Sequence, residues 1–324
     1  MRSFARLAYI LLVVGMAGIA IGCVSSPGVS GHFERTLSVN GPVILELKNG
    51  SGDAKITPGA GNQVHIRGDF TVRTWPWENS ERRAQEMSDH PPIEQTGSLI
   101  NVGVNPFGMG NVTVNYTIEV PAETELRGTV GSGEIQVRGI HGPARLSAGS
   151  GTINAKQIEQ DTTAKAGSGT VVLSDIGGQV QATVGSGDVN VSGVQGELRV
   201  RAGSGDITID RSNGAIDSTT GSGDVKIRDA KADVRAKSGS GDISIEGNPA
   251  PSSSWEFHTA SGDVTLRVPS SASFRFYAHS ISGKIETNIP LVVEEQPRHE
   301  LRGRVGDGQA RVQVVTASGD IILE

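Results

Sequence analysis

Apolar and polar residues alternate in short stretches between residues 131 and 245, and the alternation returns with a fixed 18-residue period. A Gly-Ser-Gly turn marks each return, and apolar residues stand two and four positions after its second glycine, as at Val189 and Val191. Apolar or small residues follow at positions 11, 13 and 15, as at Leu198, Val200 and Ala202. Each pattern has the period of two that predicts a short strand with one face turned inward. The second glycines of these turns are Gly133, Gly151, Gly169, Gly187, Gly205, Gly223 and Gly241.

This repeat predicts an all-β fold, a single β-helix (solenoid) in which each repeat forms one rung. A rung cannot bury its apolar face alone, so it becomes stable when neighbouring rungs stack on it. The coil is expected to be right-handed, because crossovers between parallel strands are nearly always right-handed. The inward residues are small, and aromatic residues make up 4% of the chain, so the predicted core is thin.

The period is interrupted toward the N-terminus. An early copy of the turn, Gly50-Ser51-Gly52-Asp53, lies between alternating segments, so the solenoid domain is expected over residues 33–324. A short helical insertion is predicted at about residues 75–92, where Asn79 precedes a charged run in the manner of a helix cap. Trp75 and Trp77 are expected to hold this helix against the solenoid.

The period also changes toward the C-terminus. The turn glycines that follow Gly241 are Gly262 and Gly283, at a longer interval than before, and bulky residues such as Trp255 and Phe274 appear at inward positions. Longer C-terminal rungs with a larger core are therefore expected. Residues 301–324 are predicted to form a hairpin-like piece that ends on one more copy of the turn.

Residues 1–23 have the pattern of an export signal. Arg2 and Arg6 precede an apolar run that ends at Gly22-Cys23, and Cys23 is the single cysteine in the 324-residue chain. This ending is similar to the lipobox of bacterial lipoproteins, so Cys23 is the predicted lipidation site, and residues 24–32 would form a tether. The protein is then expected in the bacterial cell envelope, anchored to the outer membrane and facing the periplasm or the exterior. An ordinary signal or anchor helix is the alternative.

Three features of the solenoid sequence also resemble those of a known protein family. They are the recurrent Ser-Gly-Asp turns followed by isoleucine or valine, the segment Ile118–Pro121 before the regular repeats, and the ending Leu301–Glu324 with its final Ser-Gly-Asp. Together they resemble the bacterial envelope β-solenoids of the putative adhesin family, of DUF4097 type, over about residues 33–324. The resemblance implies a β-helix at the cell envelope, and no functional residues can be carried over from it.

Stacking would align the residues that follow the second glycines into one acidic column. Carboxylates about 5 Å apart repel one another, and a divalent cation such as calcium would relieve the repulsion. The alternative is structural, because aspartate commonly binds backbone N–H groups in tight turns. Thr152 and Thr170 occupy the same position in earlier rungs and favour the structural role, and no other cofactor is predicted. The candidate metal ligands are Asp188, Asp206, Asp224 and Asp242.

The outward positions of the second strand carry mostly basic residues, although the whole chain has a net charge of −6. A basic stripe on a rigid sheet would attract an anionic glycan, lipid phosphate or an acidic partner. The alternative is that lysine and arginine keep an exposed sheet soluble and unpaired. Nucleic acid is not expected, because the protein is exported and few aromatic residues accompany the basic ones. The residues of this stripe are Arg145, Lys165, Arg199, Arg201, Arg235 and Lys237.

A polysaccharide-acting enzyme is the hypothesis from another class, since β-helices also carry lyases and hydrolases. Such a site needs acids and bases clustered in a groove, and regular rungs without long loops are expected to present flat faces instead. The seven histidines share no column at the spacing of the repeat, and no catalytic residues are assigned. The sequence therefore favours a non-catalytic scaffold for adhesion or for binding an envelope glycan or protein. An accessory role in envelope-stress signalling is the second interpretation.

Overall fold

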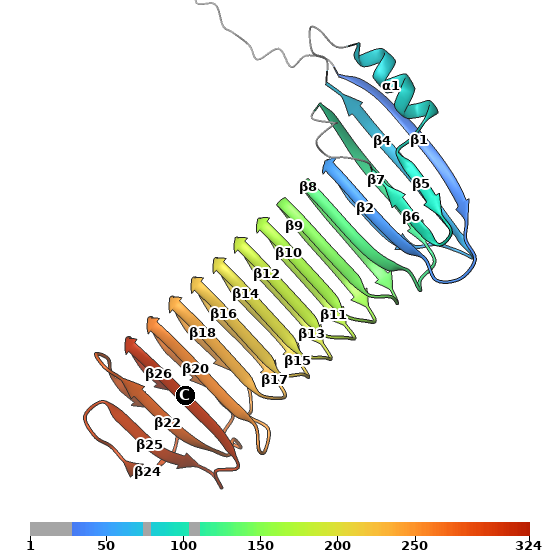
Figure 1. Cartoon of the computed structure of the whole chain (residues 1–324). Coiled ribbons are helices and arrows are strands. Elements are labelled where there is room, and N and C mark those ends of the chain that lie inside the picture. Colours follow the sequence, from blue (N-terminus) through green and yellow to red (C-terminus); the bar gives the residue numbers. More distant parts are fainter. Residues whose placement is uncertain (1–27, 74–78, 104–110) are drawn as a thin grey trace, which may run out of the picture.

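The computed structural model describes residues 28–73, 79–103 and 111–324. In this part of the chain, twenty-seven strands and one helix are present, and the strands form one continuous hydrogen-bonded network. Figure 1 shows the strands stacked side by side along one axis, with the helix near one end of the stack and the last strands at the other. The predicted all-β solenoid is confirmed.

The regular rungs pair in parallel, each with the next copy of the repeat, so that Leu198 lies beside Val180 and Ile216. We call the strands that precede each Gly-Ser-Gly turn sheet 1 and the strands that follow it sheet 2. In the regular part, sheet 1 contains β10 (Thr162–Ser168), β12 (Val180–Ser186), β14 (Leu198–Ser204), β16 (Ile216–Ser222) and β18 (Val234–Ser240). Sheet 2 contains β11 (Val171–Ile176), β13 (Val189–Val194), β15 (Ile207–Ser212), β17 (Val225–Ala230) and β19 (Ile243–Glu246). The long strands β8 (Glu125–Ile140) and β9 (Ala144–Ile158) run through the turn and contribute to both sheets.

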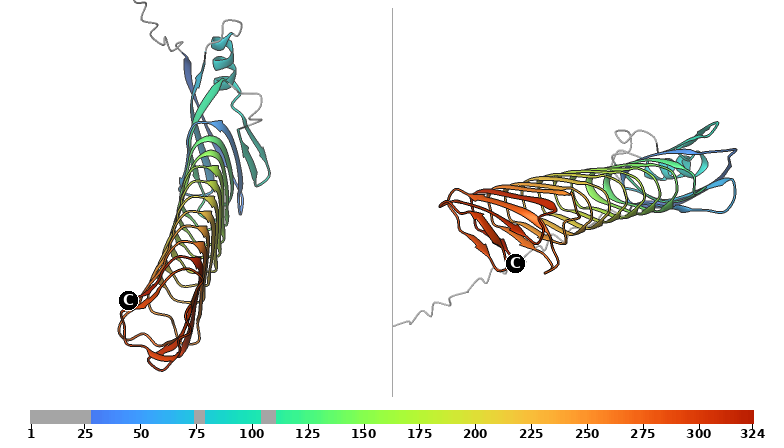
Figure 2. Two further views of the ribbon diagram at one scale, coloured as in Figure 1. Left: turned by 90° about the vertical axis from the view of Figure 1, so that its left-hand side faces the viewer. Right: turned by 90° about the horizontal axis from the view of Figure 1, so that it is seen from below.

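The two sheets lie face to face as the broad sides of a flattened coil, which the views of Figure 2 show from its edge and from below. In Figure 1 the arrows of sheet 1 point to the upper left while the stack advances to the lower left, with sheet 2 behind it. This direction of winding is right-handed, as the crossover rule predicts.

The core is a set of stacked columns. Inward positions of neighbouring rungs hold the same kind of residue, and Ile207, Ile209, Leu198 and Val200 are completely buried in successive strands. The outward positions between them are exposed or half-buried, which is the alternation predicted for each strand. Each rung thus buries its apolar face only against the rungs on either side.

The turn glycines stack so closely that a side chain has no room. A Cβ atom on Gly203 would lie 2.5 Å from the carbonyl oxygen of Gly185, and one on Gly205 would lie 2.1 Å from that of Gly187. Gly205 also has a φ of +144°, a conformation that residues with a side chain rarely adopt. The repeated Gly-Ser-Gly is therefore required by the distance between rungs as well as by the turn.

At the N-terminal end, an antiparallel cap covers the first rungs. Strand β1 begins at Val29, inside the segment expected to be a tether, and pairs with β4, which pairs in turn with β7. Phe33, Phe70 and Tyr116 form an aromatic cluster within this cap. The elements of this end are β1 (Val29–Ser38), β2 (Ile44–Ser51), β3 (Ala54–Pro58), β4 (Gln63–Val72), α1 (Ser80–Asp89), β5 (Ile93–Thr96), β6 (Leu99–Val102) and β7 (Val112–Val120).

The helical insertion is confirmed as α1. The side chain of Asn79 caps it by accepting a hydrogen bond from the backbone nitrogen of Arg82 at 2.9 Å. Ala84 and Met87 are buried, and the helix packs against β1 and β4. The predicted contact of Trp75 and Trp77 with the helix lies outside the described residues.

The C-terminal end contains the longer rungs that the spacing predicts, since Ser240 of β18 pairs with Ser261 of the next rung. Trp255, Phe257 and Phe274 are completely buried there, which confirms the bulkier core. The elements are β20 (Ser254–Ser261), β21 (Val264–Arg267), β22 (Phe274–Ser280), β23 (Ile285–Thr287), β24 (Val292–Glu295), β25 (Glu300–Val305), β26 (Ala310–Ser318) and β27 (Ile321–Leu323).

The order of the last rungs differs from their order in the sequence. Strand β26 pairs in parallel with β20 on one side and with β22 on the other, and β27 lies likewise between β21 and β23. The expected hairpin over residues 301–324 is wrong, because β25 and β26 lie on opposite sides of β22. The C-terminal rung is thus inserted inside the stack and does not end it.

The N-terminal end repeats this arrangement. Strands β2 and β3 lie between β6 and β7 on the outer side and β8 on the inner side, although β6 and β7 come later in the chain. The first complete rung is therefore enclosed by later segments. At both ends, the rung that is outermost in the sequence order occupies the second-to-last position in the stack of rungs.

Candidate functional site

The predicted acidic column exists, and it is held together by the backbone. One carboxylate oxygen of Asp206 accepts a hydrogen bond from the backbone nitrogen of Asp224 at 2.8 Å, and Asp224 does the same for Asp242 at 2.9 Å. The contact recurs between Asp188 and Asp206 at 3.0 Å and between Asp242 and Asp263 at 2.8 Å. Each carboxylate therefore stabilises the turn of the next rung, which is the structural role considered for these residues.

Within the described part of the chain, no group of three or more His, Cys, Asp or Glu side chains is placed to hold a metal ion. In the acidic column each of the four aspartates uses one oxygen for the neighbouring turn. The contacts support the structural role, and calcium binding by the column stays a prediction.

Substitutions of Asp224 separate the two roles. Asp224→Asn keeps an oxygen that accepts the hydrogen bond, so we expect an unchanged melting temperature, whereas Asp224→Ala should cost about 1 kcal/mol of stability. The chelator EDTA should leave the wild-type melting temperature unchanged. A calcium-dependent rise in the melting temperature that Asp224→Asn abolishes would show instead that the column binds metal.

The six predicted basic residues all lie on sheet 1 or its turns, but they form two columns with different surroundings. Arg145, Arg199 and Arg235 contact acids: Arg145 lies 2.7 Å from Glu125, and Arg235 lies 2.9 Å from Glu256. Arg199 lies 2.7 Å from Glu197 and 3.6 Å from Asp217. These glutamates stand two positions before an arginine or in the wider rung beyond β18, so the outward positions of the repeat alone do not reveal them.

The other three basic residues form what we call the cation ladder: Lys165, Arg201 and Lys237. These side chains are exposed, and within the described residues they make no side-chain hydrogen bond or ion pair. In the register of sheet 1, Thr183 separates the first two and Thr219 separates the last two. The cations therefore recur at every second rung, about 9.6 Å apart at the usual strand spacing.

This spacing has a physical reason. In-register parallel strands place identical positions side by side, so cations in adjacent rungs would repel one another. A separation of two rungs is close to the Debye length of about 10 Å at 0.1 M salt, which reduces that repulsion. The ladder is thus stable without acidic partners, and its charge remains available to a ligand.

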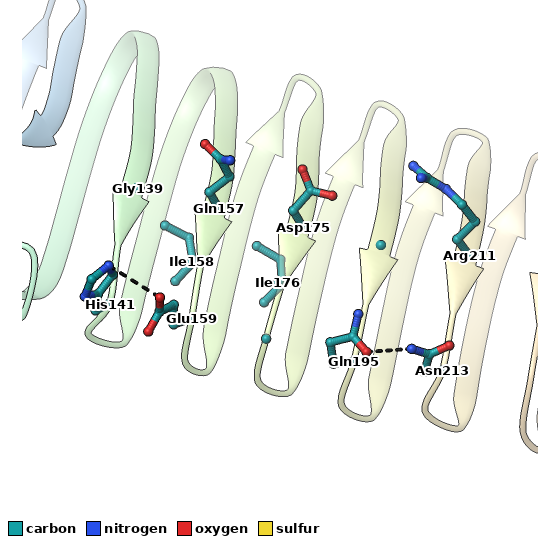
Figure 3. A pocket seen from close by; sticks show the side chains of 12 residues that line it. Gly139, His141, Gln157, Ile158, Glu159, Asp175, Ile176, Gln195, Arg211 and Asn213 are labelled. Atoms are coloured by element: carbon teal, nitrogen blue, oxygen red, sulfur yellow. Dashed lines mark hydrogen bonds and ion pairs between the residues drawn. The ribbon is translucent and has the colours of Figure 1, made fainter.

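A groove lies on the other side of the coil, at the bend that follows the sheet 2 strands. It has a volume of 720 Å³ and spans the rungs from Gly139 to Asn213. Figure 3 shows the side chains along it in two rows. One row contains Gln157, Asp175 and Arg211, and the other contains His141, Glu159, Gln195 and Asn213. The expectation of only flat faces is therefore wrong.

The groove follows from an unusual backbone conformation repeated in six successive rungs, from Gly139 to Asp229. In these rungs the residue six positions after the second turn glycine has a φ between +52° and +71°, which bends the chain at the end of sheet 2. Glycine is used at Gly139 and Gly193, and a residue with a side chain is used in four other rungs. These four are Gln157, Asp175, Arg211 and Asp229. The left-handed conformation costs about 1–2 kcal/mol at Gln157 and Arg211, and less at the two aspartates, which tolerate it better.

His141 links two acids at one end of the groove. Its Nδ1 lies 3.0 Å from Glu123 and its Nε2 lies 3.4 Å from Glu159. The hydrogen bond to Glu123, supported by the charge of Glu159, raises the pKa of His141. At the other end of the groove, the Asn213 side chain donates a hydrogen bond to Gln195. The middle is open, because Gly177 and Gly193 carry no side chain there.

The expectation that the histidines share no column is wrong at the C-terminal end. His258 and His279 both pair with Val315, because β26 is inserted between their strands. Burial lowers the pKa of His258, and the neighbouring charge of Lys237 lowers it further. The pair lies two rungs apart, so it forms no catalytic or metal-binding constellation.

The fold and its surfaces define the class of this protein as a β-solenoid scaffold built of stacked, in-register rungs. The chain belongs to the DUF4097 family, described as Toastrack, whose model matches residues 43–324. Among solved structures, a putative cell adhesion protein from Clostridium sporogenes is similar over 91% of this chain and 99% of that chain, with 14% identity and a TM-score of 0.23. At that score the likeness adds nothing to the argument. A comparison with curated proteins gave no match.

Proposed function

We propose that the protein is a lipid-anchored, non-catalytic scaffold of the bacterial cell envelope that binds an acidic linear polymer along sheet 1. The observation that carries the proposal is the cation ladder, Lys165, Arg201 and Lys237, which is exposed and without ion-pair partners in the described chain. A rigid row of like charges at a regular interval suits a polymer whose own charges recur along its length. Membership of the DUF4097 family supports a scaffold role. An acidic glycan is the ligand class that the surface of sheet 1 fits.

The proposed anchor is Cys23, which lies outside the described residues. The described chain begins beside β1, at the end of the rod opposite the C-terminal rungs in Figure 1. Sheet 1 runs through twelve parallel strands, from β6, β2, β8, β9 and β10 to β18, β20, β26 and β22, and so extends about 50 Å. A lipid at residue 23 would hold one end of this rod at a membrane and leave sheet 1 accessible along its length. No helix in the described ranges is long and apolar enough to cross a bilayer.

Charge reversal of the ladder tests the proposal. The full chain in detergent micelles is titrated with alginate, a linear polyuronic acid, at several salt concentrations. We expect salt-sensitive binding by the wild type and a loss of at least about tenfold in Lys165→Glu/Arg201→Glu/Lys237→Glu, because attraction becomes repulsion along the whole row.

The matched control reverses three exposed lysines elsewhere: Lys156→Glu/Lys226→Glu/Lys231→Glu, on sheet 2 and the bend after β17. It changes the net charge by the same amount and should reduce binding by less than about threefold, through the long-range field alone. Equal losses in the two variants would show that net charge, and no site on sheet 1, governs binding. If the wild type did not bind alginate, acidic polyuronates would be excluded as the ligand class.

A further inference from the structure

We propose that the groove after sheet 2 is a second binding site, which takes a neutral, linear oligosaccharide lying along the solenoid axis. The site is separate from the cation ladder, and it does not depend on the function proposed for sheet 1. The groove crosses five successive rungs, from Gly139 to Asn213, and therefore runs for about 19 Å at the usual strand spacing. A length of this kind and an open top suit an extended chain better than a compact metabolite.

The chemistry of the walls suits hydroxyl groups. Gln157, Gln195 and Asn213 offer amides, which both donate and accept hydrogen bonds, and Glu159 and Asp175 offer acceptors. Arg211 contacts Asp210 through its Nε at 3.1 Å, and its two terminal nitrogens remain as donors for a ligand oxygen. Sugar hydroxyls donate and accept, so a glycan can use every one of these groups. An extended peptide would gain most by pairing with a free strand edge. The sheet 2 strands are paired on both sides here, so they offer a peptide no free edge.

The charges of the groove distinguish its ligand from that of the ladder. Glu159 and Asp175 are acidic, whereas Arg211 is basic and the pKa of His141 is raised, so both signs of charge are present along the walls. The two acids would repel a polyanion, and Arg211 would repel a polycation. A neutral ligand meets none.

Several wall groups keep free hydrogen-bonding capacity. Asp175 makes no side-chain hydrogen bond or ion pair within the described residues, and it is exposed to the groove. Gln157 accepts from Arg138 at 3.1 Å and keeps its amide hydrogens, while Asn213 donates to Gln195 and keeps its oxygen. Gly177 and Gly193 also line the groove and have no side chain. Figure 3 shows a gap between Asp175 and Arg211 in one row and between Glu159 and Gln195 in the other.

The backbone supplies an independent reason to assign a role to these side chains. Glycine would adopt the left-handed bend without strain, and the chain uses glycine there at Gly139 and Gly193. Gln157, Asp175 and Arg211 nevertheless occupy the same position in the rungs that form the groove. Glutamine and arginine rarely adopt this conformation, so their presence at a solvent-exposed bend favours a role for the Gln157 and Arg211 side chains other than making the bend.

Glycine substitutions test this inference without damage to the fold. The full chain in detergent micelles is titrated with tetra-N-acetylchitotetraose, a neutral linear tetrasaccharide, and ligand saturation-transfer NMR reports the contact. In Gln157→Gly/Arg211→Gly we expect affinity to fall by about tenfold or more, because hydrogen bonds to the sugar are lost. The melting temperature should stay the same or rise, because backbone strain is relieved.

Asp229→Gly is the matched control, since Asp229 has the same left-handed backbone but lies one rung beyond the groove. It should bind the tetrasaccharide like the wild type. The inference is overturned if the wild type does not bind the tetrasaccharide, if the double variant binds unchanged, or if Asp229→Gly loses as much. Tighter binding of a neutral unstructured peptide of equal length would overturn the ligand class. Alginate binding through sheet 1 should be the same in all of these variants.

Discussion

Gly205→Ala is expected to lower the free energy of unfolding by about 3 kcal/mol or more. The added Cβ would lie 2.1 Å from the carbonyl oxygen of Gly187, a backbone atom that cannot move without shifting its rung. Overpacking of this kind costs about 1–3 kcal/mol. The φ of +144° adds strain of similar size for any residue with a side chain. Urea unfolding followed by circular dichroism measures the loss.

Gly61→Ala separates the two contributions. Gly61 has a φ of +73°, yet nothing lies within 4 Å of an added Cβ, so only the backbone strain should appear, at about 1 kcal/mol. If Gly205→Ala proved no more destabilising than Gly61→Ala, the rungs would be spaced more loosely at the turns than the structure shows.

Deletion of residues 310–324 is expected to open the whole C-terminal end of the solenoid. These residues form β26 and β27, which lie between two other rungs and bury Val312, Val314 and Leu323. Their loss would leave β20 and β22 without a partner on that side and expose Phe257 and Phe276. Hydrogen exchange measured by mass spectrometry should show rapid exchange from about residue 254 to the new terminus, with little change in the regular rungs.

Deletion of residues 189–206 is the matched control. It removes one complete rung and joins Asp188 to Ile207 in the same register. The neighbouring rungs can stack on each other in place of the lost one, so the shortened chain should fold with slow exchange throughout. Slow exchange over 254–280 in the C-terminal deletion would show that the inserted rung is dispensable.

The regular rungs could be predicted from the sequence because a single repeat determines them. Period-two alternation selects the inward residues, such as Val189 and Val191, and the constant interval between repeats sets the register. The turn glycines follow from the same stacking. Local pattern and long-range pairing agree in this part of the chain, so no further information is needed.

The order of rungs at the two ends could not be predicted in the same way. Every turn carries nearly the same residues, so the sequence does not say that Gly283 stacks on Gly319, which in turn stacks on Gly262. The pairing there is set by bulk, as the aromatic residues of β20 and β22 pack against the β-branched residues of β26. Contact between segments so distant in the sequence leaves no periodic signal.

The candidate sites were predicted in part. The acidic column and the basic stripe follow from the repeat, but the hydrogen bonds of the former and the ion pairs of Arg145, Arg199 and Arg235 depend on neighbouring columns. The groove was missed. A signal for it was present, since Gly139 and Gly193 alternate with larger residues at one position of the repeat, where glycine indicates a positive φ.

The most direct test of the proposed function is affinity capture from native bacterial envelope with the full chain as bait, followed by compositional analysis of the bound glycan. The account predicts that the wild type and the Lys156→Glu/Lys226→Glu/Lys231→Glu control retain a uronic-acid-rich or otherwise acidic glycan. Lys165→Glu/Arg201→Glu/Lys237→Glu should not retain it, because the cation ladder is reversed. Equal recovery of the acidic glycan by all three baits, or recovery of none by the wild type, would contradict the account.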